Sequence, residues 1–168
     1  MSDAPKLVLD KDGPIGWIIF NQPEKRNAVS QEMWQLMPDH VRDLASDDTI
    51  RVVILRGAGD RAFVAGADIS QFKERRRNMA DEEEYSRASA RGQEALATLS
   101  KPLLAMIHGY CVGGGVSIAI TCDIRIAADD ARLGEGDVRH FRVTYPGAPA
   151  GARGAAIWLY KVGEVAGD

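Results

Sequence analysis

The sequence is poor in three features, each of which would point to a particular class of protein. Only two of its 168 residues are cysteines, Cys111 and Cys122, and both lie in apolar surroundings, which argues against a disulfide framework. No apolar run approaches the roughly 20 residues that a membrane-spanning helix needs. The formal net charge of −3 lacks the positive excess typical of nucleic-acid-binding proteins. We therefore expect no nucleic-acid partner and no membrane partner.

The composition is that of a folded domain with a substantial core. Hydrophobic residues make up 45% of the chain and charged residues 27%, a balance typical of one globular domain. The polar segment Met1–Pro5 does not resemble the apolar centre of a signal peptide. These features predict a soluble, cytoplasmic protein.

The first third of the chain reads as two strands, a helix and a third strand. Lys6–Leu9 and Ile15–Phe20 flank a turn sequence and predict a hairpin. Ser30 can cap a helix that runs to about Ala45, although Pro38 inside it should kink it or end it. Val52–Leu55 reads as a buried strand, and Gly57–Ala67 reads as the loop that follows it. This order predicts an α/β fold in which helices cross over a sheet. The apolar side of the helix would consist of Met33, Trp34, Met37, Val41 and Leu44.

The most informative stretch is Lys101–Ala128. It predicts a buried strand at Leu103–Ile107, a glycine-dense loop at His108–Gly115, a buried helix at Val116–Cys122 and a strand at Asp123–Ala128. Glycines let a ligand approach the backbone closely, and the helix N-terminus behind them offers unpaired N–H groups. Such a unit can bind an anion or an oxyanion with backbone groups alone. Close packing of the helix on a strand would explain the same glycines.

Three segments in order resemble the enoyl-CoA hydratase/isomerase (crotonase) family. They are Asn21–Pro23 with Asn27–Ala28, then Ala62–Ile69, then Leu104–Ile124. The resemblance extends over about Leu7–Leu133. It implies a crotonase-like spiral of repeated β-β-α units, an acyl-CoA thioester substrate, and a homotrimer or hexamer. It implies no metal and no cofactor other than the coenzyme A of the substrate.

The resemblance also assigns an oxyanion hole, with the backbone N–H groups of Ala67 and Gly114 as its two donors. These would stabilise the enolate of the thioester. Lys25 and Arg26 would lie at the nucleotide end of coenzyme A, unless their loop is only a solvated turn, and Asp68 would cap the turn that follows it. The substrate-binding or coenzyme-binding residues implied are Lys25, Arg26, Ala28, Ala65, Gly66, Ala67, Asp68, Ile69, Gly113 and Gly114.

The acid–base positions depart from the family pattern. Hydratases of the family carry a glutamate three residues after the middle glycine, and here that residue is Ser117, which cannot act as a carboxylate base. The second family glutamate corresponds to Asp137, which we predict as the catalytic acid or base. Glu135 could replace it, and both carboxylates could instead be solvated loop residues.

The resemblance fades towards the end of the chain. It predicts a core domain over residues 1–133 and a divergent or truncated tail over residues 134–168, without the family's C-terminal helices. A frameshift is one hypothesis for this tail. Tyr145–Ala148 resembles the family's glycine-proline stretch only weakly.

Three functions remain open. The first is an acyl-CoA enzyme, for which a single carboxylate suits double-bond isomerisation better than hydration. The second is a catalytically inactive fragment that binds acyl-CoA. The third is a serine hydrolase of the related Clp-peptidase architecture with Ser117 as nucleophile, but spacing assigns it no partner among His40, His108 and His140.

The segment Ser70–Leu99 is charged and reads as a helix. Its charge runs, Arg75–Arg77 and Glu82–Glu84, are typical of a solvated helix face. The alternative is that the arginines assist in binding the phosphates of coenzyme A.

Overall fold

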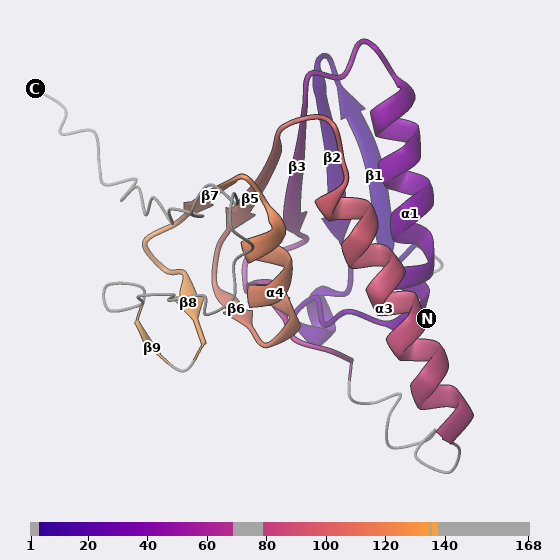
Figure 1. Cartoon of the computed structure of the whole chain (residues 1–168). Coiled ribbons are helices and arrows are strands. Elements are labelled where there is room, and N and C mark those ends of the chain that lie inside the picture. Colours follow the sequence, from indigo (N-terminus) through magenta and orange to yellow (C-terminus); the bar gives the residue numbers. More distant parts are fainter. Residues whose placement is uncertain (1–3, 69–78, 135, 138–168) are drawn as a thin grey trace, which may run out of the picture.

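The computed structural model describes residues 4–68, 79–134 and 136–137, and it is built from a repeated unit of two strands and a helix. Figure 1 shows the three repeats, and the bounds of their elements are as follows. The repeats are β1 (Leu7–Asp12), β2 (Ile15–Phe20) and α1 (Gln31–Ser46); β3 (Val52–Gly57), β4 (Ala62–Ala65) and α3 (Met79–Ala97); and β5 (Leu103–Ile107), β6 (Tyr110–Val112) and α4 (Gly114–Thr121). A short helical turn, η1 (Pro23–Lys25), follows β2, and β7 (Ile124–Ala127), β8 (Arg132–Leu133) and β9 (Gly136–Asp137) follow α4. The predicted spiral of β-β-α units is therefore confirmed.

The strands form two sheets: both strands of the first repeat join one sheet, whereas the second and third repeats contribute one strand to each. The five-stranded sheet has the order β1-β2-β3-β5-β7, with β1 antiparallel to β2 and the other pairs parallel. The second sheet has the order β4-β6-β8-β9, with only the last pair antiparallel. Phe20 of β2 and Phe63 of β4 meet edge to face at 6.0 Å between ring centroids, which joins the two sheets in one core.

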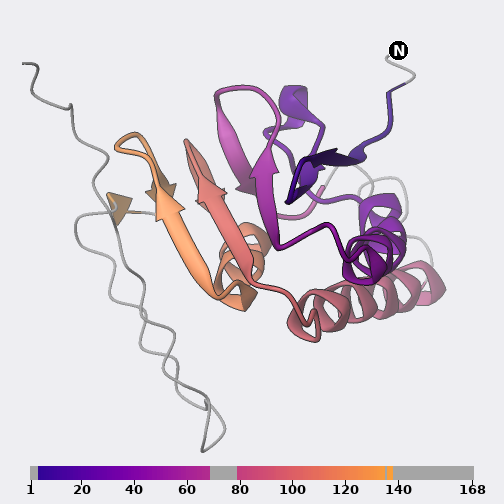
Figure 2. The same cartoon turned by 90° about the horizontal axis from the view of Figure 1, so that it is seen from above.

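Helices α1 and α3 pack side by side and lie on the same side of the five-stranded sheet (Figure 2). The side chain of Ser30 accepts a hydrogen bond from the Met33 N–H, as predicted for the helix N-cap. The predicted apolar face of α1 is also confirmed, because all five of its residues are buried. Pro38 does not end the helix, which continues to Ser46. Burial of the apolar residues on both sides of Pro38 favours continuation despite the missing hydrogen bond.

Two short strands lie where the sequence predicts loops. β4 occupies part of the predicted loop Gly57–Ala67, and β6 occupies the middle of the predicted loop His108–Gly115. Those two predictions are wrong because strands of three or four residues show too little alternation to be recognised. Burial stabilises these two strands, because Ala62–Val64 and Cys111 are fully buried. The glycine loop is correspondingly shorter, and α4 begins at Gly114 instead of Val116.

The charged helix is confirmed in its second part. α3 begins at Met79, and residues 70–78, which include Arg75–Arg77, lie outside the described residues. The side chains of Glu82–Glu84 are exposed, as predicted for a solvated face. Within the described residues, no helix has the length and apolar character needed to cross a membrane.

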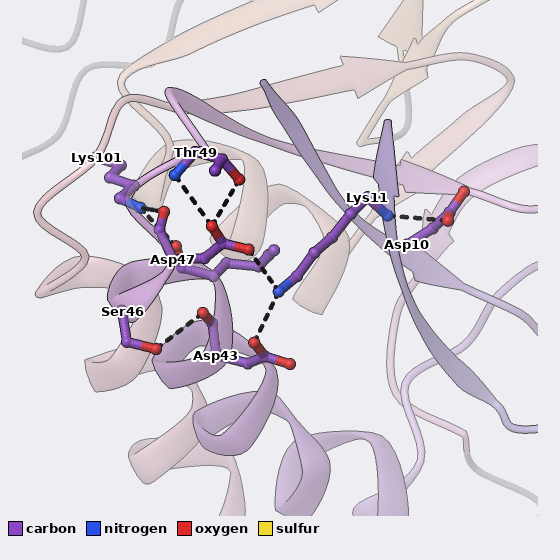
Figure 3. A network of polar contacts seen from close by, with 8 residues as sticks. Asp10, Lys11, Asp43, Ser46, Asp47, Thr49 and Lys101 are labelled. Atoms are coloured by element: carbon purple, nitrogen blue, oxygen red, sulfur yellow. Dashed lines mark hydrogen bonds and ion pairs between the residues drawn. The ribbon is translucent and has the colours of Figure 1, made fainter. Parts of the chain in front are cut away.

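A polar network holds the end of the molecule where the parallel strands begin (Figure 3). The Lys11 ammonium contacts the carboxylates of Asp43 at 2.9 Å and Asp47 at 2.8 Å, and so joins the β1–β2 hairpin to the C-terminal end of α1. Asp47 also accepts hydrogen bonds from the N–H and hydroxyl of Thr49. The Lys101 ammonium donates to the backbone carbonyl groups of Leu44 and Asp47. The bonds from Lys11 and Thr49 hold the pKa of Asp47 well below its usual range.

Candidate active site

Two loops from different repeats pair at the opposite end of the parallel strands. The Val29 N–H donates to the Gly66 carbonyl at 2.8 Å, and the Asp68 N–H donates to the Val29 carbonyl at 3.0 Å. Ala67 lies between these two bonds in a parallel bridge with Val29. In such a bridge the middle residue turns its own N–H away from the partner strand. The Ala67 N–H therefore points away from Val29.

Asn27 fixes the first of these loops from within. Its side-chain oxygen accepts from the Gln22 N–H at 3.0 Å, and its amide nitrogen donates to the carbonyl groups of Ala58 at 2.9 Å and Ala62 at 2.7 Å. The residue is fully buried and has a φ of 55°, a left-handed conformation that asparagine adopts more readily than most residues. The Asn27 side chain thus accepts from one backbone N–H and donates to two backbone carbonyl groups. Asparagine suits this position because its side-chain amide carries both an acceptor and donors.

The three glycines at the start of α4 differ in conformation and surroundings. Gly113 has φ 53° and ψ −119°, a conformation open essentially to glycine alone. A Cβ on Gly115 would lie 2.1 Å from the Val64 carbonyl oxygen, so this residue allows α4 to pack directly on β4. A Cβ on Gly114 would make only ordinary contacts, the nearest with the Gly66 carbonyl carbon at 3.8 Å and the Ala67 nitrogen at 4.0 Å. Close packing therefore explains Gly115 and backbone conformation explains Gly113, whereas approach of a ligand to Gly114 stays a prediction.

The amides of Ala67 and Gly114 lie near each other. A Cβ position is about 2.5 Å from its own nitrogen, so the two amide nitrogens are at most about 6.5 Å apart. One oxygen that accepts from both at about 2.9 Å needs nitrogens no more than about 6 Å apart, so a shared acceptor stays a prediction. Among the residues that the structure describes, neither N–H donates a backbone hydrogen bond. Gly114 is also the first residue of α4, where the helix dipole favours negative charge.

The far end of α4 is held by two residues that follow it. Asp123 accepts from the Leu103 N–H at 2.9 Å and donates its own N–H to the Leu103 carbonyl, which ties the end of α4 to the start of β5. Arg125 is 1% exposed and donates to the carbonyl groups of Ala119 and Cys122 at the C-terminal end of the helix. A cation there complements the helix dipole. Arg125 was not predicted as part of the site, although an arginine within the apolar run Ile124–Ala127 is a visible signal.

The residues predicted to bind coenzyme A lie around the paired loops. The Lys25 ammonium forms an ion pair with the Asp68 carboxylate at 2.8 Å, and the guanidinium carbon of Arg26 lies 4.7 Å from the centre of the Tyr110 ring. The Ala65 N–H donates to the Arg26 carbonyl at 3.0 Å. Ala28 is buried, and its carbonyl accepts from the Gln22 side chain at 3.1 Å. The position predicted for Ile69 lies outside the described residues. Coenzyme binding by this set stays a prediction.

The predicted acid or base, Asp137, is placed only through its backbone, and Ser117 occupies the other acid–base position. Ser117 is exposed on α4, one helical turn after Gly114. Asp137 belongs to β9, and its backbone pairs with Arg132 of β8, which in turn pairs with Tyr110 of β6. Two strand spacings, about 10 Å, therefore separate Asp137 from the strand that leads to the glycine loop. The side chain of Asp137, and Glu135 as a whole, lie outside the described residues.

Tyr85 of α3 also reaches the paired loops, which its sequence context did not predict. Its hydroxyl accepts from the Trp34 indole at 3.2 Å and donates to the Val29 carbonyl at 3.4 Å. Burial raises the pKa of Tyr85, so the phenol keeps its proton at neutral pH. The thiols of Cys111 and Cys122 have pKa values raised to about 12 by burial and are therefore poor nucleophiles. No three His, Cys, Asp or Glu residues gather as a metal site in the described part of the chain.

Comparison with known proteins identifies relatives along most of the chain. The family model for enoyl-CoA hydratase/isomerase matches residues 10–164, so the match extends beyond the predicted limit at Leu133. The short-chain-enoyl-CoA hydratase of Clostridium acetobutylicum is 36% identical over 132 residues, which are 79% of this chain and 50% of the relative. The hydroxycinnamoyl-CoA hydratase-lyase of Pseudomonas fluorescens is 35% identical over 131 residues, or 76% of this chain and 47% of the relative.

Solved structures agree with the sequence relatives. An enoyl-CoA hydratase/carnithine racemase from Magnetospirillum magneticum has a TM-score of 0.73 at 32% identity, covering 86% of this chain and 54% of its own. The enoyl-CoA hydratase of Bacillus anthracis has a TM-score of 0.70 at 30% identity, covering 77% and 50%. The chain thus spans about half the length of the curated relatives it matches.

Proposed function

The chain belongs to the enoyl-CoA hydratase/isomerase family, and on this premise we propose that it polarises the carbonyl group of an acyl-CoA thioester. The backbone N–H groups of Ala67 and Gly114 are the two donors of the oxyanion hole. The observation that carries this proposal is the approach of Gly114 to Gly66 and Ala67, together with the bridge to Val29 that leaves the Ala67 N–H pointing away from the partner strand.

The chemistry follows from where charge develops. Removal of a proton next to the thioester carbonyl produces an enolate, whose negative oxygen would accept from both amides. Each such donor is typically worth about 3 kcal/mol in the transition state. Because the donors are backbone groups on packed elements, they need no reorganisation when the charge appears.

We propose proton transfer by Asp137 and double-bond isomerisation as the reaction. Hydration requires activation of a water molecule as well as delivery of a proton, work suited to two carboxylates, whereas isomerisation moves one proton between carbons. The residue three positions after Gly114 is Ser117, so only one of the two acid–base positions carries a carboxylate. Assembly into trimers or hexamers also stays a proposal.

A second candidate is an acyl-CoA-binding protein without turnover. It is favoured by Ser117, which offers no carboxylate beside the oxyanion hole. A serine hydrolase has less support, because within the described residues no histidine is hydrogen bonded to Ser117; the His40 ring instead contacts the Leu7 carbonyl at 3.3 Å.

The test is an ultraviolet assay of the purified chain with two substrates. A 3-enoyl-CoA should gain the absorbance of a conjugated thioester upon isomerisation, and crotonyl-CoA should lose it upon hydration. We expect a gain with the first substrate that is abolished in Asp137→Asn. Binding of coenzyme A thioesters without any absorbance change would favour the second candidate, and absence of binding would refute both.

A further inference from the structure

We propose that the ion pair between Lys25 and Asp68 is a positioning device for the Ala67 amide, an inference that rests on the proposed function. The Lys25 nitrogen lies 2.8 Å from a carboxylate oxygen of Asp68. The Asp68 side chain is only 3% exposed, whereas the Lys25 side chain is 40% exposed. The pair therefore reaches from the surface to a buried carboxylate beside the oxyanion hole.

Burial gives this pair a different character from a surface ion pair. A carboxylate removed from water is costly unless a cation and hydrogen bonds compensate its charge, so its position follows that of its partner. Asp68 is additionally held by its N–H, which donates to Val29. The residue directly after Ala67 is thus fixed through both its backbone and its side chain.

The lysine side of the pair is equally well anchored. Lys25 ends the helical turn η1, and its carbonyl accepts from the Ala28 N–H at 3.1 Å. The same loop is bound to β4 through the buried side chain of Asn27. The ion pair consequently connects two rigid segments and limits rotation of the peptide that carries the Ala67 N–H.

A competing role for Lys25 makes a different kinetic prediction. If its ammonium binds a phosphate of coenzyme A, its loss weakens ground-state binding and raises KM with little change in kcat. If it positions the Ala67 amide, its loss weakens an interaction that matters most in the transition state, and kcat falls. The two roles can therefore be separated by measurement.

The experiment uses Asp68→Asn, Lys25→Met and the double variant, with Lys25→Arg as the conservative replacement. Two readouts are recorded: kcat and KM with a 3-enoyl-CoA, and the red shift of the absorbance of bound 2,4-hexadienoyl-CoA, which reports polarisation of the carbonyl. We expect each single variant to lose at least ten-fold in kcat and most of the red shift, with KM within two-fold. Lys25→Arg should recover most of both.

The double variant separates positioning from stability. With both charges removed, no unpaired buried charge remains, so its resistance to urea should recover relative to Lys25→Met. Its red shift should stay small, because the connection between the loops is still missing. Recovery of the red shift together with stability would overturn the proposal. Glu32→Gln is the matched control, since it removes an ion pair with Lys6 that is exposed on both sides, and it should change neither readout.

The outcomes distinguish this inference from the proposed function. A wild-type protein that gives neither turnover nor a red shift refutes the oxyanion hole and, with it, the positioning role. A wild-type protein that gives a red shift, with variants that keep it, refutes the positioning role alone. A rise in KM at unchanged kcat in Lys25→Met assigns the lysine to the coenzyme instead.

Discussion

The two ends of the parallel strands are held by different means. Where the strands begin, charged side chains such as Lys11, Asp43 and Lys101 connect the hairpin, the C-terminal end of α1 and the segment that leads into the third repeat. Where they end, backbone hydrogen bonds, one buried amide side chain and close-packed glycines bring the loops together. Long exposed side chains adjust to change and contribute little each, whereas buried backbone contacts tolerate no displacement. The candidate site lies at the end held mainly by buried contacts, to which the ion pair of Lys25 with the buried Asp68 carboxylate adds.

The largest effect should come from an added methyl group at the site end. In Gly115→Ala the new Cβ would lie 2.1 Å from the Val64 carbonyl oxygen, so either α4 or β4 must move. We expect a loss of more than about 3 kcal/mol in the free energy of unfolding. Gly13→Ala at the other end meets no atom within 4 Å and has only its φ of 53° to accommodate, about 1 kcal/mol. Urea denaturation measures the free energy of unfolding of both variants. Equal losses would contradict the claim that the site end tolerates less displacement than the other end.

Removal of one backbone donor should affect activity without disturbing the fold. Gly114 is the first residue of α4, a position where proline fits a helix and where the lost N–H has no intrahelical acceptor. Gly114→Pro should reduce kcat by about 100-fold or more. Gly114→Ala is the control, because it keeps the N–H and its Cβ makes only ordinary contacts. Equal activity of the two variants would refute a role for the donor.

Loss of the buried amide side chain should have an intermediate effect. Asn27→Ala would leave the Gln22 N–H and the Ala62 carbonyl without their partner. Unsatisfied buried groups cost about 1–3 kcal/mol, so we expect a loss of about 2 kcal/mol in the free energy of unfolding. Thr49→Ala removes an exposed hydrogen bond to Asp47 at the opposite end and should cost less than about 1 kcal/mol. A larger loss for Thr49→Ala would reverse the comparison.

The smallest effect should be the pH dependence of the exposed network. The pKa of Asp47 is lowered from 3.8 when folded, so its contribution is complete above that value and is lost as the pH falls through the folded pKa. The pKa of Lys11 is raised from 10.5, so its contribution is complete below 10.5 and is lost as the pH rises further.

The stability difference between wild type and Lys11→Met should therefore be constant between about pH 5 and pH 9 and shrink outside that range. It should also decrease in 1 M salt, because exposed charges are screened. Denaturation curves across this range provide the check. A difference that grows in acid would show that the network is not what stabilises this end.

The sequence predicted most of the fold because its long elements carry strong patterns. The apolar face of α1, its cap at Ser30 and the buried strand β5 are all local signals that the structure confirms. β4 and β6 could not be predicted, because three or four residues carry no measurable period and are held by partners far along the chain. The continuation of α1 through Pro38 likewise depends on tertiary burial.

The candidate site was predictable only where it consists of motifs. Gly113–Gly115 are visible in the sequence, but their separate roles depend on the neighbours Gly66 and Val64. The contacts of Lys25 with Asp68 and of Tyr85 with Val29 join residues that no local pattern relates. Contacts between side chains of distant segments depend on the topology of the fold. They therefore could not be predicted from local patterns in a single sequence.

The parallel bridge between Val29 and Ala67 has a consequence for how the protein folds. One proposed oxyanion donor, Ala67, is ordered by the first repeat, and the other, Gly114, is the first residue of the third repeat's helix. Closing such long loops costs chain entropy before any contact repays it, so these contacts should form late. On a ribosome, the proposed oxyanion hole could not form until α4 had emerged. During refolding, thioester binding should therefore recover last, after most of the helical circular dichroism has returned.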